Sequence, residues 1–144
     1  MKIAKNALVG WSILVIDDEP DSAEVCSILL EMYGATVSVA TNGREGLEMI
    51  KKLRPRFVIT DLNMPGMNGW EMTKALKLGD RGVAEIPVVA LTAHAMSGDR
   101  NRAIEQGFHN YLTKPLQPQT FVSQLLELLV EDLPELKNVL IMDT

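Results

Sequence analysis

The stretch Phe57-Val58-Ile59-Thr60-Asp61-Leu62-Asn63-Met64-Pro65-Gly66-Met67-Asn68-Gly69 decides the fold. It opens with a short apolar run rich in β-branched residues, which is typical of a buried strand. The run ends at the carboxylate of Asp61 and gives way to a loop that contains a proline and two glycines. In open α/β sheets, ligands bind at the carboxyl ends of the strands. Asp61 is therefore our first candidate for a reactive residue.

Similar apolar runs, alternating with helical patterns, flank this stretch on both sides. The runs predict strands over residues 12–16, 36–40, 57–61, 86–92 and 109–113. Apolar spacing, caps and breakers predict helices over residues 20–33, 42–54, 70–78, 97–106 and 118–129. Nearly continuous apolar strands are buried on both faces, and parallel strands need crossover connections. The alternation therefore predicts a doubly wound α/β domain with a five-stranded parallel sheet and helices on both faces.

We expect this domain to cover residues 12–130, with an N-terminal extension at 1–11 and a C-terminal extension at 131–144. Four apolar residues of the C-terminal extension have helical spacing and predict a short extra helix: Leu133, Leu136, Val139 and Leu140. Such a helix would either cap its own domain or contact a partner, including a second copy in a homodimer.

The composition is that of an ordinary globular protein. The chain has 144 residues, of which 47% are hydrophobic and 23% charged. Its net charge of −5 argues against a nucleic-acid surface, which needs clustered Lys and Arg. Cys26 is the single cysteine, so a disulfide framework is excluded and a reducing compartment is expected. No run approaches the roughly 20 apolar residues of a membrane span. We therefore expect a cytoplasmic protein.

Polar side chains follow four of the predicted strands. Asp17 and Asp18 follow the first, Asp61 ends the third, Thr92 ends the fourth and Lys114 follows the fifth. Because parallel strands end at the same edge of a sheet, these groups should converge. Clustered carboxylates raise each other's pKa unless a cation offsets them, and oxygen ligands suit Mg²⁺. A nucleophilic carboxylate, a metal ion, a lysine and a hydroxyl are the parts needed for phosphoryl transfer to aspartate.

Because of these residues, the chain resembles a response-regulator receiver domain of two-component signalling. Such a domain is either a free-standing protein or part of a hybrid kinase. The resemblance covers about residues 12–130. It rests on four motifs in order, Asp17-Asp18, the stretch from Asp61 to Gly69, Ala90-Leu91-Thr92-Ala93 and Tyr111-Leu112-Thr113-Lys114-Pro115. It implies a flavodoxin-like sheet with strand order 2-1-3-4-5.

The resemblance also implies roles for the site residues. Asp61 would accept phosphate from the phosphohistidine of a histidine kinase or a histidine phosphotransfer protein. Asp18, Asp61 and the main-chain carbonyl of Asn63 would bind Mg²⁺ directly, with Asp17 acting mainly through water. Lys114 would pair with the phosphoryl group.

A switch is implied as well. Thr92 would move to hydrogen-bond the phosphoryl group, and Tyr111 would rotate into the space vacated. The face formed by helix 4, strand 5 and helix 5 would then change shape for a downstream protein, because an added dianion can bias a two-state element. The family also places a cis peptide bond between Lys114 and Pro115. Proline lowers the free-energy cost of the cis form.

Two alternative functions compete with a phosphoacceptor role. A receiver-like interaction domain that is never phosphorylated would be expected to lack part of the acidic set or the lysine. A Mg²⁺-dependent aspartyl phosphatase needs a second carboxylate two residues after the nucleophile, and Asn63 stands there. We therefore expect a phosphoacceptor rather than an enzyme. His94 and His109 are isolated histidines, for which a surface or core role is expected.

Overall fold

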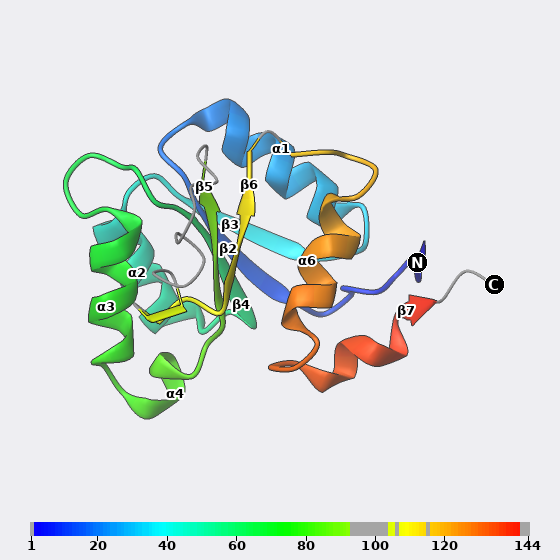
Figure 1. Ribbon diagram of the computed structural model, residues 1–144. Coiled ribbons are helices and arrows are strands. Elements are labelled where there is room, and N and C mark those ends of the chain that lie inside the picture. The colour runs from blue at the N-terminus through cyan, green and yellow to red at the C-terminus, as the bar shows by residue number, and fades with distance from the viewer. Residues whose placement is uncertain (1, 93–103, 106, 115, 142–144) are drawn as a thin grey trace.

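The computed structural model describes residues 2–92, 104–105, 107–114 and 116–141. A five-stranded parallel sheet lies at its centre, in the order β3-β2-β4-β5-β6 (Figure 1). Its strands are β2 (Ser12–Ile16), β3 (Thr36–Ala40), β4 (Phe57–Asp61), β5 (Val88–Thr92) and β6 (Asn110–Thr113). Counted over the five expected strands, this is the order 2-1-3-4-5. The predicted doubly wound, flavodoxin-like topology is confirmed.

Helices cover both faces of the sheet (Figure 1). The described helices are α1 (Pro20–Glu31), α2 (Gly43–Leu53), α3 (Gly69–Lys77), α4 (Arg81–Ala84) and α6 (Phe121–Leu129). One hydrophobic cluster joins α1 and α6 to one face, and a second joins α2, α3 and α4 to the other. Among the described helices, none combines the length and apolar character needed to cross a membrane. The helix expected over 97–106 falls outside the described residues, apart from Ile104 and Glu105.

The central strands are buried from end to end. Every residue of β4 and β5 is buried, as expected for parallel strands covered on both faces. β4 lies between β2 and β5, with Ile59 paired to Val15 on one side and Asp61 paired to Leu91 on the other. The strand that ends at Asp61 is therefore held by hydrogen bonds along both edges.

The helices that flank the Asp61 loop begin at side-chain caps. The Asn42 side chain accepts the Glu45 N–H at 2.8 Å, which starts α2 where the sequence predicted. The Glu45 carboxylate accepts the Thr41 hydroxyl at 3.2 Å. A complete capping box begins α3, between Asn68 and Glu71.

Several element boundaries differ from the sequence prediction by one to three residues, and one short helix was not predicted. α6 begins at Phe121 rather than at residue 118, because residues 118–120 form a turn in which the Thr120 N–H donates to Gln117. β5 begins at Val88 rather than at residue 86. The helix α4 was not predicted, since four residues are too few to show a periodic pattern.

Both ends of the described chain fold together into one unit, which we call the terminal clasp and define as residues 2–11 and 131–141. β1 (Lys2–Ile3) pairs antiparallel with β7 (Leu140–Ile141), and a 3₁₀ helix η1 (Pro134–Asn138) replaces the expected extra helix. Four clasp residues are buried in the cluster that holds α1 and α6: Leu8, Trp11, Leu133 and Leu136. The C-terminal extension thus packs on its own domain, the first of the two arrangements considered for it.

Arg56 joins the terminal clasp to the sheet. Its guanidinium carbon lies 4.0 Å from the centre of the Trp11 ring, and its Nη2 lies 2.7 Å from Oε1 of Glu135. Its backbone N–H donates to the Ser12 carbonyl at 2.8 Å. Because Trp11 precedes β2 and Arg56 precedes β4, the clasp lies at the amino ends of the strands. It therefore occupies the edge of the sheet opposite Asp61.

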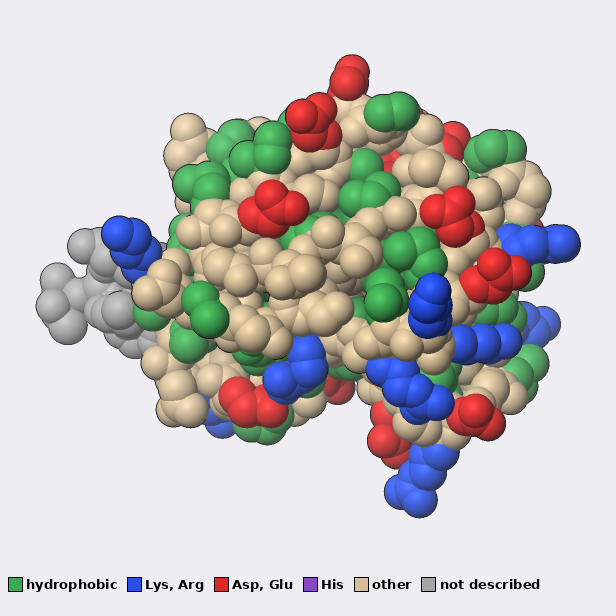
Figure 2. Space-filling model, turned by 180° about the vertical axis from the view of Figure 1, so that it is seen from behind, with side chains coloured by type: hydrophobic (Ala, Val, Ile, Leu, Met, Phe, Trp, Pro, Cys, Tyr) green, Lys and Arg blue, Asp and Glu red, His purple; other side chains and the backbone are tan. Residues whose placement is uncertain are grey.

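Charged side chains are not spread evenly over the surface. Figure 2 shows Lys and Arg side chains gathered at the lower right of the face seen from behind, where α2 and α4 lie. Lys51 and Lys52 are exposed in the last turn of α2, and Arg81 is exposed in α4. Basic side chains at a helix C-terminus offset the partial negative charge of its unpaired carbonyls. Lys51 and Lys52 therefore stabilise the C-terminal end of α2.

Candidate functional site

The three carboxylates singled out in the sequence meet at one edge of the sheet. Asp17 and Asp18 follow β2, and Asp61 is the last residue of the neighbouring strand β4. Each can offer one carboxylate oxygen such that all three oxygens lie within 4.8 Å of one another. Asp17 is 2% exposed and Asp61 is 6% exposed, so both charges are removed from bulk water. This cluster could hold a metal ion.

Lys114 faces the same cluster from the end of β6. Its Nζ lies 3.0 Å from Oδ2 of Asp17 and 3.4 Å from Oδ2 of Asp61. Lys114 therefore bridges two carboxylates that belong to two different strands. The sequence predicted Lys114 at this edge, but it did not predict that Asp17 would be its nearer partner.

The pKa values of the site follow from burial and from these charges. Burial raises the pKa of Asp61, and Asp17 raises it further, while Lys114 and the Asn63 N–H oppose the increase. For Lys114, burial lowers the pKa, but the two carboxylates outweigh burial and the net pKa is raised. Lys114 thus stays protonated at neutral pH, and the charged form of Asp61 is held at an energetic cost.

The donor set fits a hard divalent cation. Two of the three carboxylates contact the Lys114 ammonium group and Asp18 adds a third, so the cluster carries excess negative charge. Carboxylate oxygens are the protein ligands that Mg²⁺ prefers. The backbone N–H of Asn63 donates to Oδ1 of Asp61 at 3.3 Å, which brings Asn63 beside the cluster. The residues that would hold such an ion are therefore grouped at this edge.

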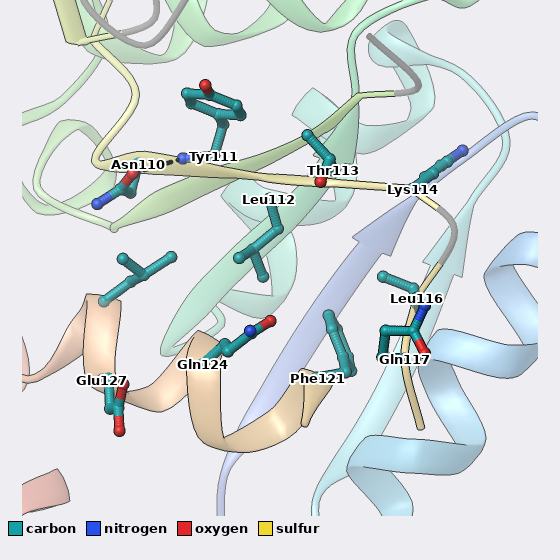
Figure 3. Close-up of a pocket in the computed structure, with 11 residues that line it drawn as sticks. Asn110, Tyr111, Leu112, Thr113, Lys114, Leu116, Gln117, Phe121, Gln124 and Glu127 are labelled. Carbon is teal, nitrogen blue, oxygen red and sulfur yellow. Dashed lines mark hydrogen bonds between the residues drawn. The ribbon is translucent and has the colours of Figure 1, made fainter. Parts of the chain in front are cut away.

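Thr92 and Tyr111 lie on the two strands beyond Asp61. Asp61 pairs with Leu91, so Thr92 stands one residue further along β5, where it is buried. Tyr111 pairs with Ala90 and packs, partly buried, against the cluster that includes α3. Figure 3 shows Tyr111 on the opposite side of β6 from Leu112. Both residues expected to act as a switch thus lie on the strands β5 and β6.

A hollow of about 580 Å³ lies between β6 and α6. Figure 3 shows Leu112 and Phe121 directed toward this space, with Gln124 and Glu127 on α6. Apolar side chains surrounded by amide and carboxylate groups are typical of a surface that binds protein. The hollow lies on the strand and final helix of the expected docking face.

Other titratable residues take structural roles. The Nδ1 atom of His109 accepts the Val88 N–H at 3.1 Å, at the amino end of β5 and away from the carboxylates. Cys26 is fully buried, and burial raises its pKa to about 12. His109 thus has the structural role expected for an isolated histidine. His94 and Pro115 lie outside the described residues, so the expected cis bond is not described.

Two glycines lie beside the site: Gly69, which ends the Asp61-to-Gly69 motif, and Gly43, which was not singled out in the sequence. Gly69 follows the 62–68 loop, and its N–H donates to the Leu62 carbonyl at 3.1 Å. Gly43 begins α2, and its N–H donates to the Met67 carbonyl at 3.1 Å. The signal available in the sequence was the Asn42 cap, which places Gly43 at the start of a helix.

Comparison with known proteins assigns the family. The chain matches the response regulator receiver domain over residues 13–126. An uncharacterized 14.6 kDa protein of Leptolyngbya boryana is 39% identical over 113 residues, which are 78% of this chain and 86% of that protein. Histidine kinase 1 of Arabidopsis thaliana is 32% identical over 86% of this chain but only 13% of the kinase.

A solved structure shows the same fold. The chemotaxis response regulator CheY4 of Vibrio cholerae superposes with a TM-score of 0.76 and 28% identity, over 84% of this chain and 98% of that one. The chain therefore belongs to the response regulator receiver domain family. It is a receiver domain of two-component signalling, related both to response regulators and to the receivers of hybrid kinases.

Proposed function

We propose that this chain is a phosphoacceptor whose Asp61 takes a phosphoryl group from a phosphohistidine, with Mg²⁺ held by Asp18, Asp61 and the main-chain carbonyl of Asn63. The observation that supports this most directly is the convergence of Asp17, Asp18 and Asp61 at one edge of the sheet, where the Lys114 ammonium group contacts Asp17 and Asp61. Asp17 would act on the metal mainly through water.

The transfer needs one nucleophile and one leaving group. A carboxylate oxygen of Asp61 forms a bond to phosphorus as the phosphorus–nitrogen bond of the phosphohistidine breaks. The imidazole leaves with the electron pair and takes up a proton. Mg²⁺, when bound, would offset the charge on the phosphoryl oxygens. Lys114, already charged and held by Asp17 at 3.0 Å, would pair with a further oxygen.

The phosphoryl group would then act on the docking face. Thr92 would hydrogen-bond it, and Tyr111 would follow into the space that Thr92 leaves. Because β6 carries Tyr111 and lines the hollow against α6, a change at Tyr111 would reach the surface where a downstream protein docks. The upstream partner is a histidine kinase or a histidine phosphotransfer protein, and we place the reaction in the cytoplasm.

Catalytic turnover of outside substrates is not part of this proposal. Asn63 stands where an aspartyl phosphatase needs its second carboxylate, and its N–H is directed to Asp61. An interaction domain that is never phosphorylated would have no use for three clustered, buried or half-buried carboxylates, two of which contact one lysine. The complete set favours the phosphoacceptor.

Phosphoramidate tests the proposal, because its phosphorus–nitrogen bond is the bond that breaks in phosphohistidine. The chain is incubated with phosphoramidate and Mg²⁺, or with EDTA, and the bound phosphate is followed by ³¹P NMR. We expect an acyl phosphate signal that needs Mg²⁺ and is absent in Asp61→Asn. A signal of equal size in Asp61→Asn would refute the assignment of Asp61.

A further inference from the structure

The amide of Gly43 makes a contact that its own helix cannot supply. The first four N–H groups of a helix have no acceptor within it. Gly43 is the first residue of α2, and its N–H donates to the carbonyl of Met67 at 3.1 Å. Met67 belongs to the 62–68 loop that leaves Asp61. The start of α2 is therefore attached to this loop.

The contact leaves no room for a side chain. A Cβ atom on Gly43 would overlap the carbonyl oxygen of Met67 and would lie 3.0 Å from its Cγ and 3.1 Å from its carbonyl carbon. The overlap with the oxygen is well inside 3.0 Å, a separation that real Cβ atoms essentially never show. Because the obstacle is backbone, the loop or the helix would have to move as a unit.

The loop is fixed at two points, and Asn63 lies between them. At its base, the Gly69 N–H donates to the Leu62 carbonyl at 3.1 Å, and farther along it Met67 is held by Gly43. Between these points the Asn63 N–H donates to Oδ1 of Asp61 at 3.3 Å. α2 and α3 pack against each other on this face of the sheet (Figure 1). A displacement at Met67 would therefore be passed to the segment that carries Asn63.

We propose that Gly43 is a positioning residue for the Asp61 site, because it sets the place of the loop that presents Asn63 beside the carboxylates. This inference rests on the proposed function, in which the Asn63 carbonyl and Asp61 hold Mg²⁺. Binding sites need their groups within about 0.5 Å of the productive geometry, and misplacement by about 1 Å can cost a hundredfold in rate. Relief of the Cβ overlap requires the loop backbone or the helix to shift.

Gly43→Ala tests this role, and Gly46→Ala is its matched control. Both variants add one methyl group at a buried position of α2, and alanine is the better helix former in each case. A Cβ on Gly46 would overlap Cδ1 of the Ile16 side chain and lie 3.0 Å from its Cγ1 and 3.3 Å from its Cγ2, so it would meet side-chain atoms rather than loop backbone. The two variants therefore differ in whether the 62–68 loop must move.

Affinity for Mg²⁺ is measured by titration calorimetry with magnesium chloride alone, and stability by urea unfolding with EDTA. We expect Gly43→Ala to bind Mg²⁺ at least tenfold more weakly than the unaltered chain. We expect Gly46→Ala to change stability while its Mg²⁺ affinity stays within threefold of the unaltered chain. Equal loss of Mg²⁺ affinity in both variants, or none in Gly43→Ala, would overturn the inference.

The unaltered chain gives an independent measurement if Gly43→Ala does not fold. By NMR, the Gly43 amide should be protected from solvent exchange, and it should shift with Asn63 during Mg²⁺ titration while the Gly46 amide moves less. An unprotected Gly43 amide, or one indifferent to Mg²⁺ while Asn63 shifts, would contradict the role. Failure of the unaltered chain to bind Mg²⁺ at all would instead refute the proposed function on which the inference rests.

Discussion

Asp61 is the residue where stability and function conflict. Burial raises its pKa, so at neutral pH the folded state carries a carboxylate that would be more stable in water. An acid with a raised pKa in the folded state favours the protonated form there, so its ionisation costs stability at neutral pH. Functional sites commonly carry such a cost.

Asp61→Asn should therefore stabilise the chain in the absence of metal. The amide keeps the shape and removes the buried charge, while Lys114 retains Asp17 at 3.0 Å. We expect the free energy of unfolding to rise by on the order of 1 kcal/mol at pH 7, measured by urea unfolding with EDTA. Added Mg²⁺ should stabilise the unaltered chain more than the variant. A variant less stable than the unaltered chain under metal-free conditions would show that the carboxylate is not held at a cost.

Lys114→Ala should have the opposite effect on the metal-free chain. Removal of the ammonium leaves Asp17 and Asp61 facing each other without a cation, and both are buried. We expect a loss of about 1–3 kcal/mol in urea unfolding with EDTA, with the fold retained. Added Mg²⁺ should restore part of the loss, because it offsets the same charges. Lys51→Ala, an exposed lysine of α2, is the control. A loss that Mg²⁺ does not reduce would argue against electrostatic repulsion as its cause.

The residues of the candidate site could be located from the sequence because each stands at the end of a predicted strand. Asp17, Asp61 and Lys114 needed only the rule that parallel strands end at one edge. The distances among them could not be predicted, since they depend on how three strands twist. The role of Gly43 could not be predicted either. Its partner Met67 is distant in the sequence, and glycine has no side chain that would indicate a function.

Among the elements, β6 is tied to the start of β5 by His109. Its Nδ1 accepts the Val88 N–H at 3.1 Å, and its Nε2 lies 3.6 Å from Oδ1 of Asp132. An Nδ1 that accepts a hydrogen bond carries no proton. Burial lowers the pKa of His109, and Lys77 lowers it further, while Asp132 opposes the decrease. The neutral form of His109 is therefore part of the folded structure.

This arrangement predicts an acid-dependent loss of stability. The pKa of His109 in the folded state lies below 6.5, its ordinary value, so the unfolded chain binds the proton first as pH falls. The folded state should lose stability as pH drops below about 6.5, and the loss should level off below the lowered pKa. In urea unfolding between pH 7.5 and 5.5, His109→Gln should show a shallower dependence than the unaltered chain. Parallel curves would mean that His109 does not contribute.

Element boundaries could be predicted where a local signal marks them. The cap at Asn42 marked the start of α2, and the apolar run 57–61 marked β4. The strands β1 and β7 have two residues each, so they show no alternation, and their pairing joins the two ends of the sequence. Their existence follows from the whole fold rather than from local preference.

At the scale of the whole molecule, the terminal clasp and the carboxylate cluster lie at opposite edges of one sheet. Leu136 is fully buried in the cluster that also holds Leu8, Trp11 and α6. Deletion of a buried leucine side chain usually costs about 2–5 kcal/mol. The clasp should therefore contribute to the stability of the domain as a core element would.

Leu136→Ala tests this expectation. We expect it to lower the free energy of unfolding by about 2–4 kcal/mol while Mg²⁺ affinity is unchanged in the folded chain. Glu135→Ala, which removes only the exposed partner of Arg56, should cost less than about 1 kcal/mol. The measurements are urea unfolding and Mg²⁺ titration. A cost of Leu136→Ala as small as that of Glu135→Ala would indicate that the clasp is not part of the core.

The fold as a whole was predictable because its strands are apolar and its helices alternate with them in regular order. The terminal clasp was not, because Leu133 and Leu136 showed only that the segment is apolar on one side. What that side contacts is settled by Leu8 and Trp11, more than one hundred residues earlier in the sequence. Contacts of that separation carry no local signature.

The central claim is that Asp61 accepts a phosphoryl group in a Mg²⁺-dependent reaction, and intact mass spectrometry tests it most directly. The chain is incubated with acetyl phosphate and Mg²⁺, beside Asp61→Asn and a sample with EDTA. Borohydride reduction and peptide mapping then locate the modified residue. We predict a single phosphoryl adduct at Asp61, absent from the variant and from the EDTA sample. An adduct that persists in Asp61→Asn, or no adduct on a chain that binds Mg²⁺, would contradict the account.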